Sequence, residues 1–165
     1  METIDYAGEL QSIRAIYVSV SPRQRLHVIR QRLANPDHAP NLLVTHVSAV
    51  EALARSLVSH QTGKSPASQY ARLRTKDPER LVELLLAGSG AGTPKEVFGA
   101  DCWELFRHAV NYRNMIVHEC TYLGQDKSPQ LQQACEAVLE KLVEISGLSV
   151  GANNSSKPTP LRGSG

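Results

Sequence analysis

Residues 100–121 read ADCWELFRHAVNYRNMIVHECT, and this stretch decides the fold. Its apolar residues recur every three or four positions, which is the spacing of an amphipathic helix. At about 100° per residue, one line along such a helix collects the residues that we expect to face the core. They are Cys102, Leu105, Ala109, Tyr112, Ile116 and Cys120. The stretch therefore predicts one long helix with a normal core face.

A second line of side chains on the same helix is polar. Arg107, Asn111, Asn114 and His118 fall on the side opposite the predicted core stripe. Arg113 falls at the edge of that stripe, about 140° around the helix from His118. One copy of the helix therefore cannot close both side chains on one ligand. Two copies packed across a two-fold axis would bring arginine and histidine from both chains around one cleft.

Capping signals set the neighbouring helices. Ser21, Asp77 and Ser128 each precede a proline, and Ser21 is followed by Gln24 in the spacing of a capping box. Gly147 has the character of a glycine that follows a helix C-terminus. Together with hydrophobic periodicity, these signals predict helices over 8–20, 22–34, 41–60, 78–87, 100–121 and 129–146, with a short helical turn within 66–74.

These elements predict an all-α fold, a bundle of four or more helices in one domain over residues 1–150. The β-rich stretch 13–20 is an alternative strand, although nothing obvious pairs with it. Residues 88–94, rich in glycine, predict a flexible loop, and no Gly-Lys-Ser/Thr follows to make it a phosphate loop. The polar tail 151–165 is expected to be disordered.

Composition excludes several classes of protein. There are 18 Lys and Arg against 16 Asp and Glu, so no general basic field indicates nucleic acid, and any RNA contact must be local. No apolar run was found that reaches the roughly 20 residues of a membrane span, and no secretory signal opens the chain. We expect a cytoplasmic protein without membrane contact. The three cysteines form no CxxC pair and are expected to be free thiols.

No cofactor or metal is expected either. His118-Glu119 is not a zinc motif of the HExxH type, because position 122 is tyrosine. The other histidines show no ligand spacing with a cysteine or carboxylate.

The stretch Arg113-Asn114-Met115-Ile116-Val117-His118 resembles the R-x4–6-H signature of the HEPN family (higher eukaryotes and prokaryotes nucleotide-binding). Residues 47–55, VSAVEALAR, are similar to the HEPN helix that packs beside the motif helix. The resemblance covers residues 1 to about 150. It implies a bundle that forms a two-fold homodimer with the two motif helices facing each other. Many HEPN proteins are metal-independent endoribonucleases, found among toxins, abortive-infection proteins and CRISPR-associated effectors; others are non-catalytic binding modules.

The residue types suit RNA cleavage by attack of the 2′-hydroxyl on the neighbouring phosphate. Histidine exchanges protons near neutral pH, and arginine offers paired donors to phosphate oxygens. The resemblance thus implies proton transfer by His118, phosphate binding by Arg113 and a supporting contact from Asn114. Arg107 and Asn111 are expected to extend the groove along the RNA backbone.

Two residues of the helix over 41–60, His46 and Glu51, are candidates for the same cleft, Glu51 as a buried polar partner. An RNA substrate and an antitoxin or other regulatory partner are the ligands that the resemblance implies. One toxin subgroup carries tyrosine two residues after the histidine, where this chain has Cys120. The sequence therefore departs from the arrangement in which that tyrosine is modified.

Two other interpretations remain open. The first is a non-catalytic HEPN module for dimerisation or partner binding. The second is an unrelated helical bundle in which the R-x4-H pattern occurs by chance. A protein that is monomeric at micromolar concentration would favour the chance match.

Overall fold

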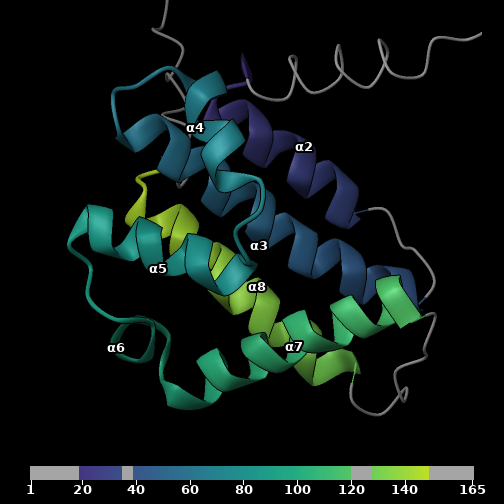
Figure 1. Ribbon diagram of the computed structural model, residues 1–165. Coiled ribbons are helices and arrows are strands. Elements are labelled where there is room, and N and C mark those ends of the chain that lie inside the picture. Colours follow the sequence, from purple (N-terminus) through teal and green to yellow (C-terminus); the bar gives the residue numbers. More distant parts are fainter. Residues whose placement is uncertain (1–18, 35–38, 120–127, 149–165) are drawn as a thin grey trace, which may run out of the picture.

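The computed structural model describes residues 19–34, 39–119 and 128–148. Within these ranges the chain forms seven α-helices and no strand (Figure 1). They are α2 (Pro22–Ala34), α3 (Ala39–Gln61), α4 (Pro66–Leu73), α5 (Pro78–Ser89), α6 (Pro94–Phe98), α7 (Ala100–Glu119) and α8 (Ser128–Ile145). The all-α prediction is confirmed. The tail 151–165 and the predicted helix 8–20, except its last two residues, lie outside the described residues.

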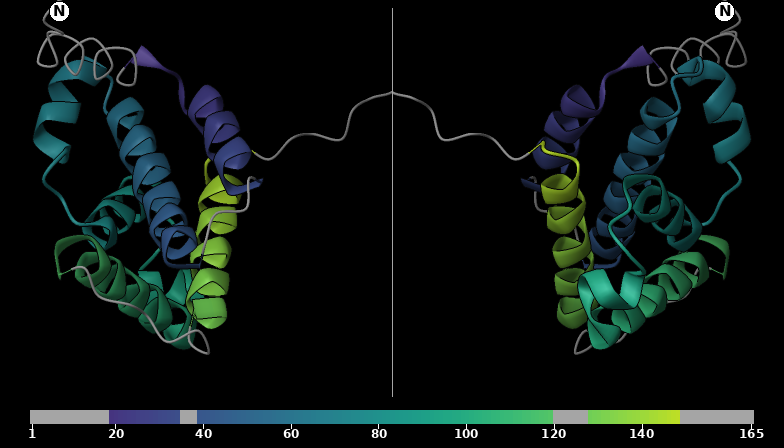
Figure 2. Two further views of the ribbon diagram at one scale, coloured as in Figure 1. Left: turned by 90° about the vertical axis from the view of Figure 1, so that its right-hand side faces the viewer. Right: turned by 90° about the vertical axis from the view of Figure 1, so that its left-hand side faces the viewer.

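Helix α3 is the centre of the bundle and contacts α2, α4, α5, α7 and α8 (Figure 1). Figure 2 shows α2 and α8 on one side of α3 and the α4–α5 segment on the other. Leu43, Val47, Val50 and Leu53 of α3 are fully buried. The segment Leu42–Gln61 is long and apolar enough to cross a membrane by length and composition, and 56% of its most apolar window is buried inside the protein. A central core helix has the same composition.

The start of α2 carries the capping box predicted from Ser21 and Gln24. The Gln24 backbone N–H donates to Ser21 Oγ at 3.3 Å, and the Ser21 N–H donates to Gln24 Oε1 at 3.1 Å. Asp77 precedes α5 as predicted, but its side chain makes no capping hydrogen bond. That part of the prediction is wrong, because the Asp77 carboxylate accepts no hydrogen bond from the backbone at the start of α5.

Gly147 ends α8 as predicted. Its φ is 69°, a left-handed conformation that glycine adopts without a steric cost. The Leu148 N–H donates to the Val143 carbonyl and the Gly147 N–H to the Glu144 carbonyl, both at 3.1 Å. This pair of bonds is the Schellman motif, which satisfies two carbonyls at the helix end.

The loop predicted over 88–94 is shorter in the structure, and both of its predicted bounds are wrong. Helix α5 continues to Ser89, and α6 begins at Pro94. Thr93 caps α6, because its hydroxyl accepts from the Glu96 N–H while the Glu96 carboxylate accepts from the Thr93 N–H. The sequence carried this signal: Thr93 is followed by a proline and, three residues on, by glutamate.

The core face of α7 lies elsewhere than predicted. Trp103, Phe106, Ala109 and Val110 are buried, and this line is rotated by roughly 80° from the predicted stripe at 100° per residue. The reason is the bulk of two aromatic side chains, which bury the most apolar area. Trp103 stacks on Phe98 of α6 with ring centroids 5.7 Å apart and lies 5.4 Å from Phe106.

Ala109 belongs to both lines, and three other members of the predicted stripe pack less deeply. Cys102, Leu105 and Tyr112 are half-buried, and the Cys102 thiol lies 3.9 Å from the Ala134 carbonyl of α8. Helix α7 therefore uses two adjacent apolar lines. The rotation moves Arg113 from the edge of the core face into the buried side.

Candidate functional site

Arg113 points from α7 toward α3, where it meets a carboxylate. Its Nη2 donates to Glu51 Oε2 at 3.0 Å, and both side chains are 19% exposed. The other oxygen, Glu51 Oε1, accepts from Arg55 Nη2 one turn further along α3. The three side chains form an Arg55–Glu51–Arg113 cluster, in which one carboxylate serves two guanidinium groups. The prediction that Glu51 is a buried polar partner in this region fits this geometry.

His118 lies near the end of α7 and is exposed. Its neighbours Met115 and Val117 are 47% and 50% exposed. They are the two large hydrophobic side chains that stand out to solvent in the described part of the chain. In that part no hydrogen bond or ion pair joins His118 to Arg113. One protomer therefore presents the two motif residues in different directions, as their spacing predicted.

Asn114, Asn111 and Arg107 line one groove of about 460 Å³ between α7 and α5. Trp103 and Val110 form its floor from α7. The structure thus brings together the three polar residues that were predicted to support and extend the site. It does not place Arg113 in that groove.

The opposite wall of this groove is acidic. Asp77, Glu79 and Glu83 line it beside one arginine, Arg80, which is 3.1 Å from Glu83. Burial raises the pKa of the Glu79 carboxyl above its usual value, and Asp77 adds to the rise. The lining thus holds three carboxylates against two guanidinium groups, one of them Arg107.

Arg107 is itself 3.2 Å from Glu104 on the same helix. A phosphate backbone needs a surplus of positive charge, which this groove lacks. The predicted RNA-backbone role of Arg107 and Asn111 is therefore not favoured by the charge of the groove in one protomer.

His46 serves the bundle and not the cleft. It is 6% exposed; Nδ1 donates to the Leu42 carbonyl at 2.7 Å, and Nε2 lies 3.0 Å from Glu136 of α8. These contacts tie α3 to α8. Sequence reasoning missed Arg55, although Glu51 and Arg55 stand four residues apart, the spacing of an ion pair on one helix face.

Other chemistry is sparse among the described residues. No group of three or more His, Cys, Asp or Glu side chains there is placed to hold a metal ion. Cys102 and Cys135 are free thiols. Burial raises the pKa of Cys102 above its usual value and raises that of Cys135 to about 12, so both thiols are poor nucleophiles at neutral pH.

Comparison of the chain with protein-family models, with curated proteins and with solved structures found no match. The HEPN resemblance therefore stays a prediction that rests on the motif and its helical setting.

Proposed function

We propose that this chain is a HEPN-type, metal-independent endoribonuclease whose active site forms where the α7 helices of two copies meet. One observation carries the proposal: His118 is exposed near the end of α7, with exposed Met115 and Val117 on either flank and Asn114 of the polar groove one turn before it. An exposed histidine beside unpartnered apolar side chains is the surface that a composite site at a dimer interface needs.

Dimerisation follows from the apolar residues. Exposed side chains such as Met115 and Val117 are favoured in the core of an interface, where contact with a second copy removes them from water. A two-fold axis near these residues would bring the same patch of both copies into contact, because such interfaces are isologous. The two copies of His118 would then lie on either side of that axis.

The chemistry needs two proton-transfer groups and one cation. One His118 accepts the proton of the 2′-hydroxyl as its oxygen attacks phosphorus, and the other donates a proton to the departing 5′-oxygen. The products are a 2′,3′-cyclic phosphate and a 5′-hydroxyl. Arg113 binds the phosphate oxygens as their charge rises, and Asn114 orients the substrate from the adjacent groove. No metal takes part in this sequence.

A second function, the non-catalytic HEPN dimerisation module, is favoured by a specific contact. Arg113 is held by Glu51 and is 19% exposed, so its charge already has a partner inside the protomer. Arg113 then stabilises the α3–α7 contact, and the exposed patch serves association alone. The acidic wall opposite Arg107 agrees with this function.

The deciding experiment uses two histidines of the same helix. The wild type, His118→Ala and His108→Ala are incubated with mixed single-stranded and structured RNAs in excess EDTA, and the fragments and their ends are analysed. His108 is a matched control because it is also exposed, at 55%. The ribonuclease proposal expects cleavage by the wild type and His108→Ala and a loss of at least about a hundredfold in His118→Ala.

Dimerisation is tested separately by light scattering after size-exclusion chromatography. Val117→Asp should shift the protein to monomer, whereas His108→Asp should not, since only the first places a charge inside the proposed interface. A folded dimer that leaves RNA intact would support the binding module. A wild type that is monomeric at micromolar concentration would contradict both functions.

A further inference from the structure

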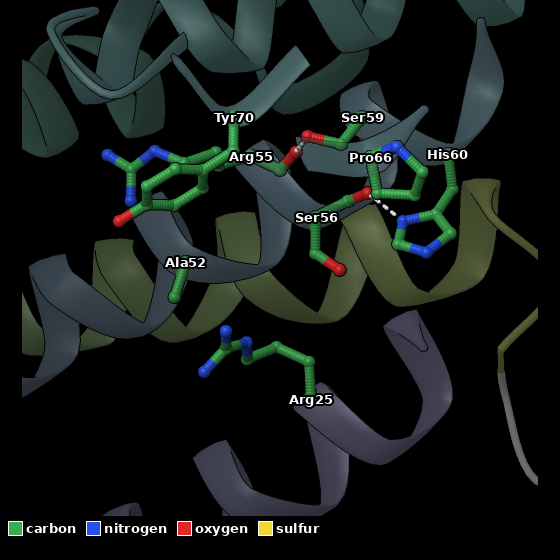
Figure 3. A pocket seen from close by; sticks show the side chains of 8 residues that line it. All are labelled: Arg25, Ala52, Arg55, Ser56, Ser59, His60, Pro66 and Tyr70. Atoms are coloured by element: carbon green, nitrogen blue, oxygen red, sulfur yellow. Dashed lines mark hydrogen bonds between the residues drawn. The ribbon is translucent and has the colours of Figure 1, made fainter. Parts of the chain in front are cut away.

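A second cavity lies on the other side of α3 from the α7 motif, between α2, α3 and α4 (Figure 3). It measures about 190 Å³. Its lining comes from three helices: Arg25, Ala52, Arg55, Ser56, Ser59, His60, Pro66 and Tyr70. None of these eight residues carries a carboxylate, whereas two carry guanidinium groups. The lining of the cavity is therefore basic, unlike that of the groove beside α7, and Glu51 offsets part of its charge through Arg55.

Polar side chains from α2, α3 and α4 surround this space. In Figure 3 Arg25 reaches from α2 toward α3, and the Ser56 hydroxyl points into the space between these two helices. The Arg55 guanidinium lies over the ring of Tyr70 from α4, 5.9 Å from its centroid. Stacking on an aromatic ring orients the planar guanidinium. The His60 Nδ1 donates to the Ser56 carbonyl at 2.8 Å, which fixes that ring as well.

Arg55 still has donor capacity toward a ligand. Its Nη2 donates to Glu51, while its Nε is buried without a hydrogen-bond partner. A guanidinium carries five N–H donors, so one carboxylate contact leaves most of them available. The buried Nε is closed to solvent, so a ligand in the cavity would meet the terminal Nη donors of Arg55.

The size and chemistry of the cavity select a small anion. Drug-sized ligands occupy clefts of roughly 300–1,000 Å³, so a space of about 190 Å³ suits a smaller molecule. Two arginines with serine and tyrosine hydroxyls match the oxygens of a phosphate group. A terminal phosphate can enter such a hollow, whereas an internal phosphodiester carries chain on both sides.

We propose that the cavity bounded by Arg25, Arg55, Ser56 and Tyr70 binds a phosphate monoester, either on a small sugar phosphate or at a phosphorylated RNA end. The site reaches the α7 motif through one carboxylate. Glu51 holds Arg55 at the cavity and Arg113 at the motif, so an anion on Arg55 competes with Glu51 for the same guanidinium. The proposal concerns binding and does not depend on ribonuclease activity.

The test titrates the whole chain with inorganic phosphate, ribose 5-phosphate and ribose in a calorimeter, with ionic strength held constant by potassium chloride. Both phosphates should bind, and ribose should not. Arg25→Gln should weaken binding about tenfold, because it removes charged donors to the anion. Ser56→Ala should weaken it severalfold, and this small change preserves the fold if the arginine variant unfolds.

Arg30→Gln is the matched control. Arg30 lies on α2 like Arg25, is 49% exposed, and pairs with Glu140 at 3.0 Å away from the cavity. Its substitution removes the same charge and should leave phosphate binding unchanged. Equal loss in both variants would overturn the proposal, since binding would then depend on net charge alone. Absence of phosphate binding by the folded wild type would overturn it as well.

A further comparison identifies the source of the phosphate. A short RNA with a 5′-phosphate is titrated against the same RNA with a 5′-hydroxyl, using the His118→Ala protein to prevent cleavage. Tighter binding of the phosphorylated RNA than of ribose 5-phosphate would assign the site to an RNA end. Weaker binding would assign it to a small metabolite. Equal, Arg25-dependent binding of both RNAs would overturn recognition of a monoester.

Discussion

Replacement of Glu51 by glutamine should cost more stability than replacement of Arg113, although the two form one ion pair. Glutamine keeps the size of the side chain and removes the charge. In Glu51→Gln both Arg55 and Arg113 lose their carboxylate and face each other in a partly buried site. In Arg113→Gln the carboxylate keeps Arg55, so no charge is left without a partner.

The magnitudes follow from burial. Removing one member of a buried ion pair costs about 3–5 kcal/mol, mostly because the remaining charge is left unpaired. The side chains here are 16–19% exposed, which lets water reach them, so we expect about 3 kcal/mol for Glu51→Gln. Arg113→Gln loses one charged hydrogen bond and should cost about 1.5 kcal/mol. The double variant should be about 1 kcal/mol more stable than Glu51→Gln, because the repulsion between guanidiniums is gone.

Urea unfolding followed by circular dichroism at 222 nm measures these differences. With a slope of about 2 kcal/mol per molar urea, the Glu51→Gln midpoint should fall by about 1.5 M. Three outcomes would refute the reasoning: Glu51→Gln no more destabilising than Arg113→Gln, additive effects in the double variant, or no change in either. Arg107→Gln, which removes a half-exposed charge from the same helix, serves as the control and should shift the midpoint little.

Three further predictions concern the core, the groove and the thiols. Phe106→Ala should lower the free energy of unfolding by about 3–5 kcal/mol, because this side chain is fully buried; a loss under 1 kcal/mol would contradict its place in the core. Folding raises the pKa of the Glu79 carboxyl, so the protonated form is favoured in the folded state. The stability that this group contributes is present below its unfolded pKa and is lost as pH rises through its folded pKa. Glu79→Gln should therefore gain stability relative to the wild type between pH 4 and pH 7, and a constant difference across that range would count against the shift. In a Cys120→Ser background at pH 8, Cys102 should react with a thiol reagent before Cys135, whose pKa burial raises to about 12; equal rates in the native state would contradict the buried position of Cys135.

The sequence predicted helix ends well where a local signal sets them. The capping box of Ser21 and the C-terminal glycine Gly147 are bonded as expected, because each depends on a few neighbouring residues. The missed helix α6 had the same kind of signal in Thr93 and Glu96. Helix α6 has five residues, too few to show a periodic hydrophobic pattern. The glycine-rich residues just before it therefore led to the prediction of a loop.

The rotation of α7 could not be obtained from that helix alone. Two apolar lines run side by side along it, and periodicity ranks them almost equally. The packing of Trp103 between Phe98 and Phe106 decides between them, and it depends on where α6 lies. Contacts between residues far apart in the sequence could not be predicted for the same reason. Glu51 and Arg113 are 62 positions apart, and the acidic wall opposite Arg107 comes from α5.

The shared carboxylate bears directly on the proposed ribonuclease. A phosphate that approaches Arg113 must compete with Glu51, and in a simple pair that competition would strand a partly buried carboxylate. Here Glu51 keeps Arg55 on its other oxygen, so releasing Arg113 leaves the carboxylate paired. The Arg55–Glu51–Arg113 cluster can thus free one arginine for a substrate at a smaller cost than an isolated pair. An anion in the second cavity would bind Arg55 and weaken its bond to Glu51. Glu51 would then bind Arg113 more strongly. Occupation of that cavity should therefore oppose phosphate binding at the motif.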